Sequence, residues 1–394
     1  MKTIKNKIGK ETVIYAETFE AEAMEQVVKM ANFEPYQNET IRIMPDAHAG
    51  KGCTVGTTMT ITDKVTPNLV GVDIGCGMLT VKLKNKIISL ETLDEVIKSK
   101  VPCGFNVHEK AQTEFELSDL VCKNHVDTER AKISIGSLGG GNHFIEVSHS
   151  ELTGDYYLII HSGSRKLGGD VCKFYQDKAF KNAMNIGNEV NALIEKLKSE
   201  GRENEIEAEL KKIKRAEIEK DLCYLQGSDF ENYMNDMEIT QKFASKNRET
   251  IADIIIHEAG LTEVERFETI HNYIDFSRMI LRKGAVSAEY GEKLLIPINM
   301  RDGSLLCIGK GNKNWNYSAP HGAGRIMSRS KAKATVDLKE FEKSMEGIWT
   351  SSVNKNTIDE SPMVYKPIEE IKENIKDTVE IEKIIKPVYN FKAN

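Results

Sequence analysis

Residues 70–78 read Val-Gly-Val-Asp-Ile-Gly-Cys-Gly-Met, and the interpretation of the whole chain starts from this stretch. Its glycines permit backbone turns that a side chain would block, and they surround Asp73 and Cys76. A carboxylate and a thiolate, joined by imidazoles, suit a transition divalent ion, whereas Mg²⁺ and Ca²⁺ prefer shells of oxygen. The stretch therefore predicts a metal site on a glycine-rich turn. The alternative is that Cys76 is a small buried hydrophobic residue.

Histidines supply the imidazoles. The chain has nine, and five of them stand beside Gly, Asn, Asp or Pro in loop-like contexts. These are His48, His143, His161, His271 and His321. Although a single histidine is usually structural, several in such surroundings favour a shared site with Asp73 and Cys76.

Three other glycine-containing stretches are candidates for phosphate contacts. Residues 137–147 (SLGGGNHFIEV) match neither the P-loop nor the dinucleotide fingerprint, and a tight hairpin turn is their alternative interpretation. Residues 161–166 (HSGSRK) place Arg165 after an apolar strand. In residues 319–333 (APHGAGRIMSRSKAK), a helix beginning near Gly324 would direct its amides at an anion, or would simply begin a solvated basic face.

Composition limits the class of protein. The chain has 394 residues, of which 29% are charged and 40% hydrophobic, and these values exclude bulk disorder and collagen-like structure. No apolar run is long enough for a membrane span, and the first residues lack the apolar core of a signal peptide. Seven scattered cysteines without a C-x-x-C pair argue against a disulfide framework and a zinc ribbon. We therefore expect a soluble, cytoplasmic protein.

The net charge of −6 is opposite to that of proteins that coat nucleic acid, so binding to nucleic acid would require a local basic face.

Hydrophobic patterning predicts a mixture of strands and helices. Residues 1 to about 175 read as short strands and glycine-rich turns, and residues 176–222 as a two-helix hairpin. Residues 223 to about 283 also have a helical pattern, strands return from Gly284, and helices follow near 337–346 and 366–380. Nothing marks a boundary, so we expect one domain, 1–394, with a helical hairpin inserted at 176–222. Its Glu/Lys faces are typical of a solvated packing or dimer-forming element.

Eight motifs occur in an order that resembles the RtcB family of RNA ligases, from about residue 40 to the C-terminus. They are MPDAHAGKG, VGVDIGCGM, GGGNHFIEV, HSGSRKLGG, HNY, RKGAV, HGAGRIMSRSKAK and DESPMVYK. The resemblance implies an α+β fold of sheets and helices around a central dinuclear metal cleft. It also implies an enzyme that joins RNA 3′-phosphate or 2′,3′-cyclic phosphate ends to 5′-hydroxyl ends, in tRNA splicing or RNA repair.

The resemblance further implies GTP as cosubstrate, two Mn²⁺ ions per subunit, a guanylated histidine and an RNA 3′-end-GMP intermediate. The expected partners are an archease-like activator and, in a homodimer, a second copy of the chain, with a monomer as the alternative. No membrane partner is expected.

The resemblance assigns roles to individual residues of this chain. His321 would be the nucleophile, and Cys76 would be shared between the two ions. The metal ligands would be Asp73, Cys76, His143, His161 and His271. GMP contacts would come from Asn142, His143, Phe144, Ile145, Glu146, His271, Asn272, Pro297, Ile298, Asn299, Met300, Ser304, His321, Gly322, Ala323, Gly324 and Lys392. We expect RNA or phosphate contacts from Arg165, Arg278, Arg282, Lys283, Arg325 and Arg329.

One stretch departs from the family pattern. Where most members carry P-G-S-M-G, this chain has Pro297-Ile298-Asn299-Met300-Arg301, which would reshape the nucleotide pocket. The departure motivates two alternatives: a metal-dependent phosphoesterase that opens cyclic phosphates without ligation, and an RNA-end-binding protein without turnover.

Overall fold

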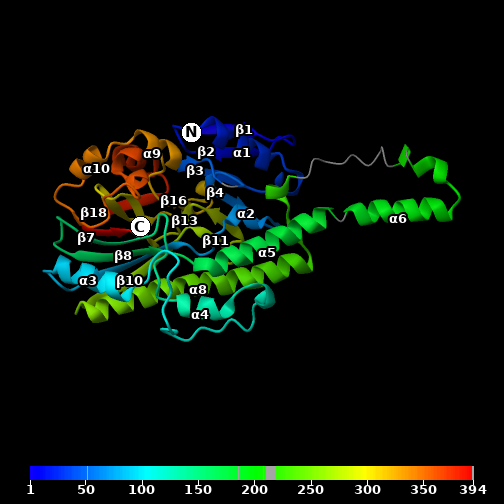
Figure 1. Cartoon of the computed structure of the whole chain (residues 1–394). Helices are drawn as coiled ribbons and strands as arrows, with labels where there is room; N and C mark the ends of the chain where they lie inside the picture. The colour runs from blue at the N-terminus through cyan, green and yellow to red at the C-terminus, as the bar shows by residue number, and fades with distance from the viewer. Residues whose placement is uncertain (51, 185, 207, 210–218, 393–394) are drawn as a thin grey trace.

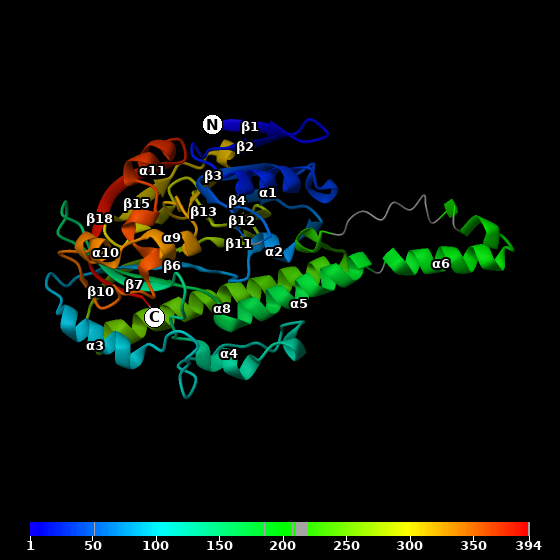
Figure 2. The same ribbon diagram turned by 45° about the horizontal axis from the view of Figure 1, so that its top comes forward.

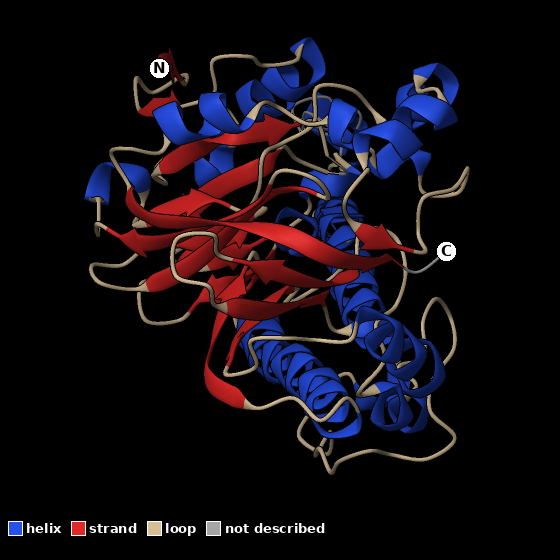
Figure 3. Ribbon diagram, turned by 90° about the vertical axis from the view of Figure 1, so that its left-hand side faces the viewer, coloured by secondary structure: helices blue, strands red, loops and turns tan. Residues whose placement is uncertain are grey.

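The computed structural model describes residues 1–50, 52–184, 186–206, 208–209 and 219–392. Strands gather in the middle of the body and helices lie around them (Figures 1 and 3). Two large β-sheets and two small ones account for the strands of the described ranges. The mixture of sheets and helices confirms the expected α+β class.

The first sheet has six strands in the order β1-β2-β3-β4-β12-β11. Only the β2–β3 pair is parallel. Helix α1 (Ala21–Ala31) packs on this sheet, since Val27 and Met30 share a core with Ile14 and Ile43. The strands are β1 (Lys2–Lys5), β2 (Glu11–Ile14), β3 (Ile41–His48), β4 (Val55–Thr60), β11 (Asn272–Asp275) and β12 (Ile280–Lys283).

The second sheet runs in the order β10-β6-β8-β7-β18-β15-β14, with β17 (Trp349–Thr350) parallel to β18. Helix α8 (Ser228–Glu258) covers one of its faces, because Ile251 and Ile255 pack against Val81, Ile145 and Leu158. The strands are β6 (Gly77–Leu83), β7 (Phe144–His149), β8 (Tyr156–Ser162), β10 (Glu263–Ile270), β14 (Lys293–Asn299), β15 (Gly303–Gly309) and β18 (Val379–Lys392).

The register of this sheet sets up the site. Opposite residues form a row across four strands: Met78, His161, Phe144 and Lys392. Because side chains alternate along a strand, this row faces away from the α8 core, whereas Ile145 and its neighbours face into it. The next row on the same face contains Glu146 opposite Asn390.

Several sequence predictions about helices were wrong. Helix α8 ends at Glu258, and residues 263–283 form the strands β10, β11 and β12 with the turns between them. Glu263–Ile270 pairs antiparallel with β6. The first 175 residues contain helices as well as strands, for example α3 (Leu90–Lys100), whose Ser89 side chain caps the Thr92 amide. Tertiary packing of these amphipathic segments outweighs the local strand signals.

The expected helix at Gly324 is also absent from the structure. Helix α9 begins at Arg329, where the Ser328 side chain accepts a hydrogen bond from the Lys331 amide. Gly324 instead has a positive φ of 74° and lies so close to β3 that a Cβ would sit 2.4 Å from the Asp46 carbonyl oxygen. The predicted helices near 337–346 and 366–380 are α10 (Leu338–Ser344) and the shorter α11 (Ile368–Asn374).

An arm extends from the body (Figures 1 and 2). It consists of the end of α5 (Arg165–Met184), then α6 (Ile186–Ser199) and the 3₁₀ turn η3 (Glu203–Glu205). Much of the returning half of the hairpin predicted at 176–222 lies outside the described residues. Beyond it, β9 (Leu225–Gln226) pairs with β5 (Lys64–Val65) in the body.

The remaining described elements are short. Strand β13 (Ala285–Ser287) pairs with β16 (Ser318–Pro320). The others are α2 (Pro67–Val70), α4 (Thr128–Ser134), η1 (Glu34–Tyr36), η2 (Lys123–His125), η4 (Lys220–Leu222), η5 (Lys313–Trp315), η6 (Ile358–Glu360) and η7 (Pro362–Val364). Within the described ranges, no helix combines the length and apolar character needed to cross a bilayer.

Candidate active site

Five side chains converge at the ends of strands in the second sheet. The Cys76 sulfur lies 3.5 Å from His143 Nε2 and 3.4 Å from His161 Nε2. His161 Nε2 lies 3.3 Å from His271 Nε2. Asp73 Oδ2 is 3.0 Å from His143 Nε2. The structure thus brings together all five predicted metal ligands.

Hydrogen bonds to backbone carbonyl groups determine which ring nitrogen carries the proton in His143 and His161. His143 Nδ1 and His161 Nδ1 face the carbonyl oxygens of Leu138 and Asn142, at 2.9 and 3.1 Å. A proton on each Nδ1 satisfies those carbonyls. Each Nε2 then keeps its lone pair, which is directed toward the Cys76 sulfur. Histidine metal ligands are fixed in this way. The donor set and its tautomers therefore fit a transition divalent ion.

Burial determines the ionisation of the cluster without a cation. Burial lowers the pKa of His161 and of His271 well below the usual value, so both imidazoles are neutral and can donate lone pairs. Burial, together with the Asp73 charge, raises the pKa of the Cys76 thiol. Burial would also raise the pKa of Asp73, but His143, Cys76 and Arg165 beside it together outweigh burial and lower the pKa to about 2.

Arg248 of helix α8 holds the strand ends that carry the ligands. Its side chain is fully buried, and Nη1 donates to the carbonyl oxygens of Gly75 and Ser162 at 2.7 and 2.8 Å. Nε donates to Glu268 at 2.8 Å. Since Gly75 and Ser162 are the neighbours of Cys76 and His161, this arginine fixes the spacing of two ligands.

His321, the predicted nucleophile, follows β16 and is anchored by Asp46 of β3. His321 Nδ1 lies 2.6 Å from Asp46 Oδ2, and that oxygen also accepts the backbone N–H groups of His321 and Gly322 at 3.1 and 3.2 Å. An Nδ1–H bonded to a carboxylate leaves Nε2 with its lone pair, which is the nucleophilic form of imidazole. The His321 ring centroid lies 5.0 Å from that of His271.

The sequence analysis did not identify Asp46, although the motif at 44–52 contains it, because only His48 of that motif was considered as a candidate. A carboxylate two residues before a histidine in a glycine-flanked stretch was the available signal.

We expect Asp46→Asn to slow covalent modification of His321 on the order of 10³-fold. An asparagine amide can turn its N–H toward Nδ1, which moves the imidazole proton to Nε2 and blocks the lone pair. Single-turnover labelling of the protein by nucleotide measures this rate, with melting temperature as the control for folding. A rate within a few-fold of wild type would contradict the role given to Asp46.

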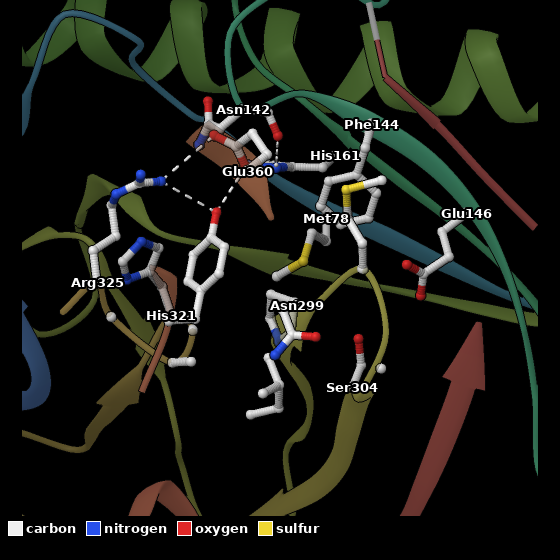
Figure 4. Close-up of a pocket in the computed structure, with 18 of the residues that line it drawn as sticks. Met78, Asn142, Phe144, Glu146, His161, Asn299, Ser304, His321, Arg325 and Glu360 are labelled. Atoms are coloured by element: carbon white, nitrogen blue, oxygen red, sulfur yellow. Dashed lines mark hydrogen bonds and ion pairs between the residues drawn. The ribbon is translucent and has the colours of Figure 1, made fainter. Parts of the chain in front are cut away.

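A cavity lies on the face of the second sheet that carries the row of Met78, His161, Phe144 and Lys392 (Figure 4). All but three of the predicted GMP contacts line it. The exceptions are His143, which belongs to the ligand cluster, Ile145, which faces the α8 core, and Asn272. Asn272 lines a second cavity together with Asp73, Cys76 and Lys283.

The two cavities meet at His321. His48, Asn142, His271 and His321 line both of them. The anchored imidazole therefore lies between the ligand cluster and the first cavity, where it has access to a group bound in either.

The predicted basic contacts fall into different environments. Arg325 and Arg329 line the first cavity. Both are bound to two adjacent acidic residues that the sequence analysis did not single out, Asp359 and Glu360. Lys392 Nζ donates to Glu360 Oε2 at 2.7 Å. Burial would raise the pKa of Glu360, but Lys392 and Arg329 outweigh burial and lower it to about 2.

The other four basic residues lie elsewhere. Arg165 lines a third cavity with Arg130 and Lys166. Lys283 lines the second cavity and donates to the Asn68 carbonyl oxygen at 3.0 Å. Arg278 pairs with Glu289 near the surface, whereas Arg282 is fully buried and pairs with Asp275. The structure therefore does not bring all six side chains to one surface.

The divergent stretch after Pro297 keeps its place in the cavity wall. Ile298, Asn299 and Met300 all line the cavity, and Ile298 and Met300 are also part of hydrophobic clusters. The Asn299 side chain accepts the amides of Arg301 and Asp302 at 3.0 and 2.8 Å, which closes the turn. The turn is thus stabilised from within, by a residue that replaces the family's hydroxyl.

Comparison with known proteins agrees with this geometry. A family model described as tRNA-splicing ligase RtcB matches residues 26–128 and 118–393. The RNA-splicing ligase RtcB of Escherichia coli K12 is 29% identical, over 92% of this chain and 92% of that protein. A second E. coli strain has an RNA-splicing ligase RtcB1 that is 30% identical over the same shares, and the tRNA-splicing ligase RtcB of Aeropyrum pernix is 26% identical over 91% and 90%. With this match over most of its length, the chain belongs to the RtcB family of tRNA-splicing ligases.

Proposed function

We propose that this RNA ligase joins RNA 3′-phosphate or 2′,3′-cyclic phosphate ends to 5′-hydroxyl ends, with GTP as cosubstrate and two Mn²⁺ ions. The observation that carries the proposal is the position of His321, which Asp46 holds between the ligand cluster and the first cavity. Asp73, Cys76, His143, His161 and His271 would hold the ions, with Cys76 shared. When bound, the ions would neutralise charge on phosphate oxygens and polarise the phosphorus.

The first step forms a bond between His321 Nε2 and the α-phosphorus of GTP, and breaks the bond from that phosphorus to pyrophosphate. Asp46 stabilises the positive charge that develops on the imidazole. A 2′,3′-cyclic end is first hydrolysed by water, which breaks the bond from phosphorus to the 2′-oxygen and leaves a 3′-phosphate. An oxygen of the RNA 3′-phosphate then attacks the phosphorus of the bound GMP, and the histidine leaves. The 5′-hydroxyl next attacks the 3′-phosphate phosphorus, and GMP leaves. Guanylation is needed because the oxygens of a 3′-phosphate are poor leaving groups.

The cavity supports recognition of a nucleotide. Glu146 presents a buried carboxylate, and Phe144 presents a ring over which Lys392 Nζ lies 5.5 Å from the centroid (Figure 4). A carboxylate suits the N1–H and amine donors of guanine, because it can accept both at once. Arg325 and Arg329 are available for phosphates once an anion competes with Asp359 and Glu360.

A joining assay tests the proposal. We expect RNA strands with a 2′,3′-cyclic phosphate and a 5′-hydroxyl to be joined only when GTP and Mn²⁺ are both present, with transient accumulation of RNA capped by GMP at its 3′ end. Omitting GTP or chelating the metal is the control. Opening of cyclic ends without joining would favour the phosphoesterase, and end binding without any reaction would favour the binding protein.

A further inference from the structure

Asn390 lies next to Glu146 on the floor of the first cavity, and it is not among the predicted GMP contacts. The two residues are direct partners in the register of β18 and β7, so their side chains share one face of the sheet. Both line the cavity, as does Ser304 of β15. Asn390 is almost fully buried, which sets it apart from a solvated polar residue.

The hydrogen bonds of Asn390 leave one polar atom unused. Its Nδ2 donates to Glu146 Oε2 at 3.0 Å, and Ser148 Oγ donates to Glu146 Oε1 at 2.7 Å. Because an ionised carboxylate only accepts, the amide nitrogen must face Glu146 and Oδ1 must face away. Asn390 Oδ1 is buried and has no hydrogen-bond partner among the described residues. Such an acceptor is costly in a folded protein unless a ligand supplies a donor.

We infer that Asn390 Oδ1 and the Glu146 carboxylate together bind the exocyclic amine of guanine, and that Asn390 is a specificity-determining residue for GTP. The inference rests on the proposed function. The Watson–Crick edge of guanine offers three donors, one on N1 and two on the 2-amino group. The floor offers three matching acceptors, two carboxylate oxygens with a lone pair each to spare and Asn390 Oδ1. Inosine lacks the amine, and adenine carries an acceptor at N1.

The ionisation of Glu146 depends on the groups that surround its carboxyl. Burial raises the pKa of Glu146 to about 7, although hydrogen bonds from Ser148 and Asn390 and the charge of Lys392 act in the opposite direction. Ser148 and Asn390 therefore both favour the ionised carboxylate, which accepts from guanine. Of these two, only Asn390 lines the cavity and can offer an acceptor to a ligand there. This difference separates direct recognition from mere support of Glu146.

The test compares GTP with ITP as α-labelled substrates for covalent labelling of the protein. We expect wild type to use GTP at least about tenfold more efficiently at limiting nucleotide, because ITP leaves Asn390 Oδ1 unpaired. In Asn390→Leu, which keeps the volume, the preference should fall below about threefold. In Ser148→Ala, the matched control, both nucleotides should be used less efficiently while the preference persists.

Each outcome decides the inference. Equal use of GTP and ITP by wild type, an unchanged preference in Asn390→Leu, or an equal loss of preference in Ser148→Ala would overturn it. A wild type that forms no adduct with any nucleotide overturns the proposed function, and the inference fails with it. If Asn390→Leu does not fold, calorimetry of GMP and IMP binding to wild type decides, with about tenfold tighter GMP binding expected and equal affinities overturning the inference.

Discussion

Replacing His321 with alanine is expected to abolish covalent guanylation and RNA joining altogether. The variant lacks the imidazole whose Nδ1 is held by Asp46 and whose Nε2 stays free between the two cavities. No other group replaces a nucleophile that is positioned within reach of the phosphorus. Incubation with α-labelled GTP and Mn²⁺, without RNA, followed by denaturing electrophoresis measures the adduct. An acid-labile label on wild type that is missing from the variant is the expected result.

The matched control is His257→Ala, since His257 lies at the exposed end of helix α8 and is remote from the cluster in the fold. It should be labelled as wild type is. Metal content and melting temperature of His321→Ala should stay near those of wild type, because His321 is not among the ligands. Persistent labelling of His321→Ala would identify another nucleophile, with His48 the next residue to replace, since it lines both cavities.

Removal of the Cys76 sulfur is the second change with a very large expected effect. In Cys76→Ala the ligand that the two ions would share is lost, so Mn²⁺ occupancy should fall and joining should decrease by at least about 10³-fold. The loss should exceed the 10–100-fold effect that follows from changing a residue that merely orients a ligand. Metal content after desalting and the rate of joining at saturating GTP are the two measurements.

Cys307→Ala serves as the matched control, because Cys307 is also a buried cysteine but lies in the hydrophobic cluster of β14 and β15. This variant should lose some stability through the missing packing while keeping its metal content. Full activity and unchanged metal content in Cys76→Ala would show that the sulfur is not a ligand.

Local sequence rules predicted some elements and failed for others. The strand at Tyr156–Ser162 was apparent from its apolar and aromatic run, and helix α8 from its helical pattern. The same helical interpretation was carried past Glu258 into β10, whose residues pair with β6 far earlier in the chain. A short segment next to a long helix has no local signal as strong as the backbone pairing that a neighbouring strand provides.

The order of the motifs in the sequence was enough to identify the family, and the resemblance supplied the five predicted ligands and the predicted nucleophile. These residues are recognisable because metal binding and phosphoryl transfer require particular side-chain chemistry, and glycines place them on turns. The resemblance placed Ile145 among the GMP contacts, whereas the structure packs its side chain in the core beneath helix α8.

Only the tertiary structure decided which polar groups meet. Asp46 and His321 are 275 positions apart, and Asn390 and Glu146 are 244 positions apart. The same holds for Glu360, whose bonds to Lys392 and Arg329 occupy side chains expected to be free for GMP and RNA. The physical reason is that strand register and the contacts between distant segments come from packing of the whole chain, and a shift of one residue would turn each of these side chains to the opposite face of the sheet.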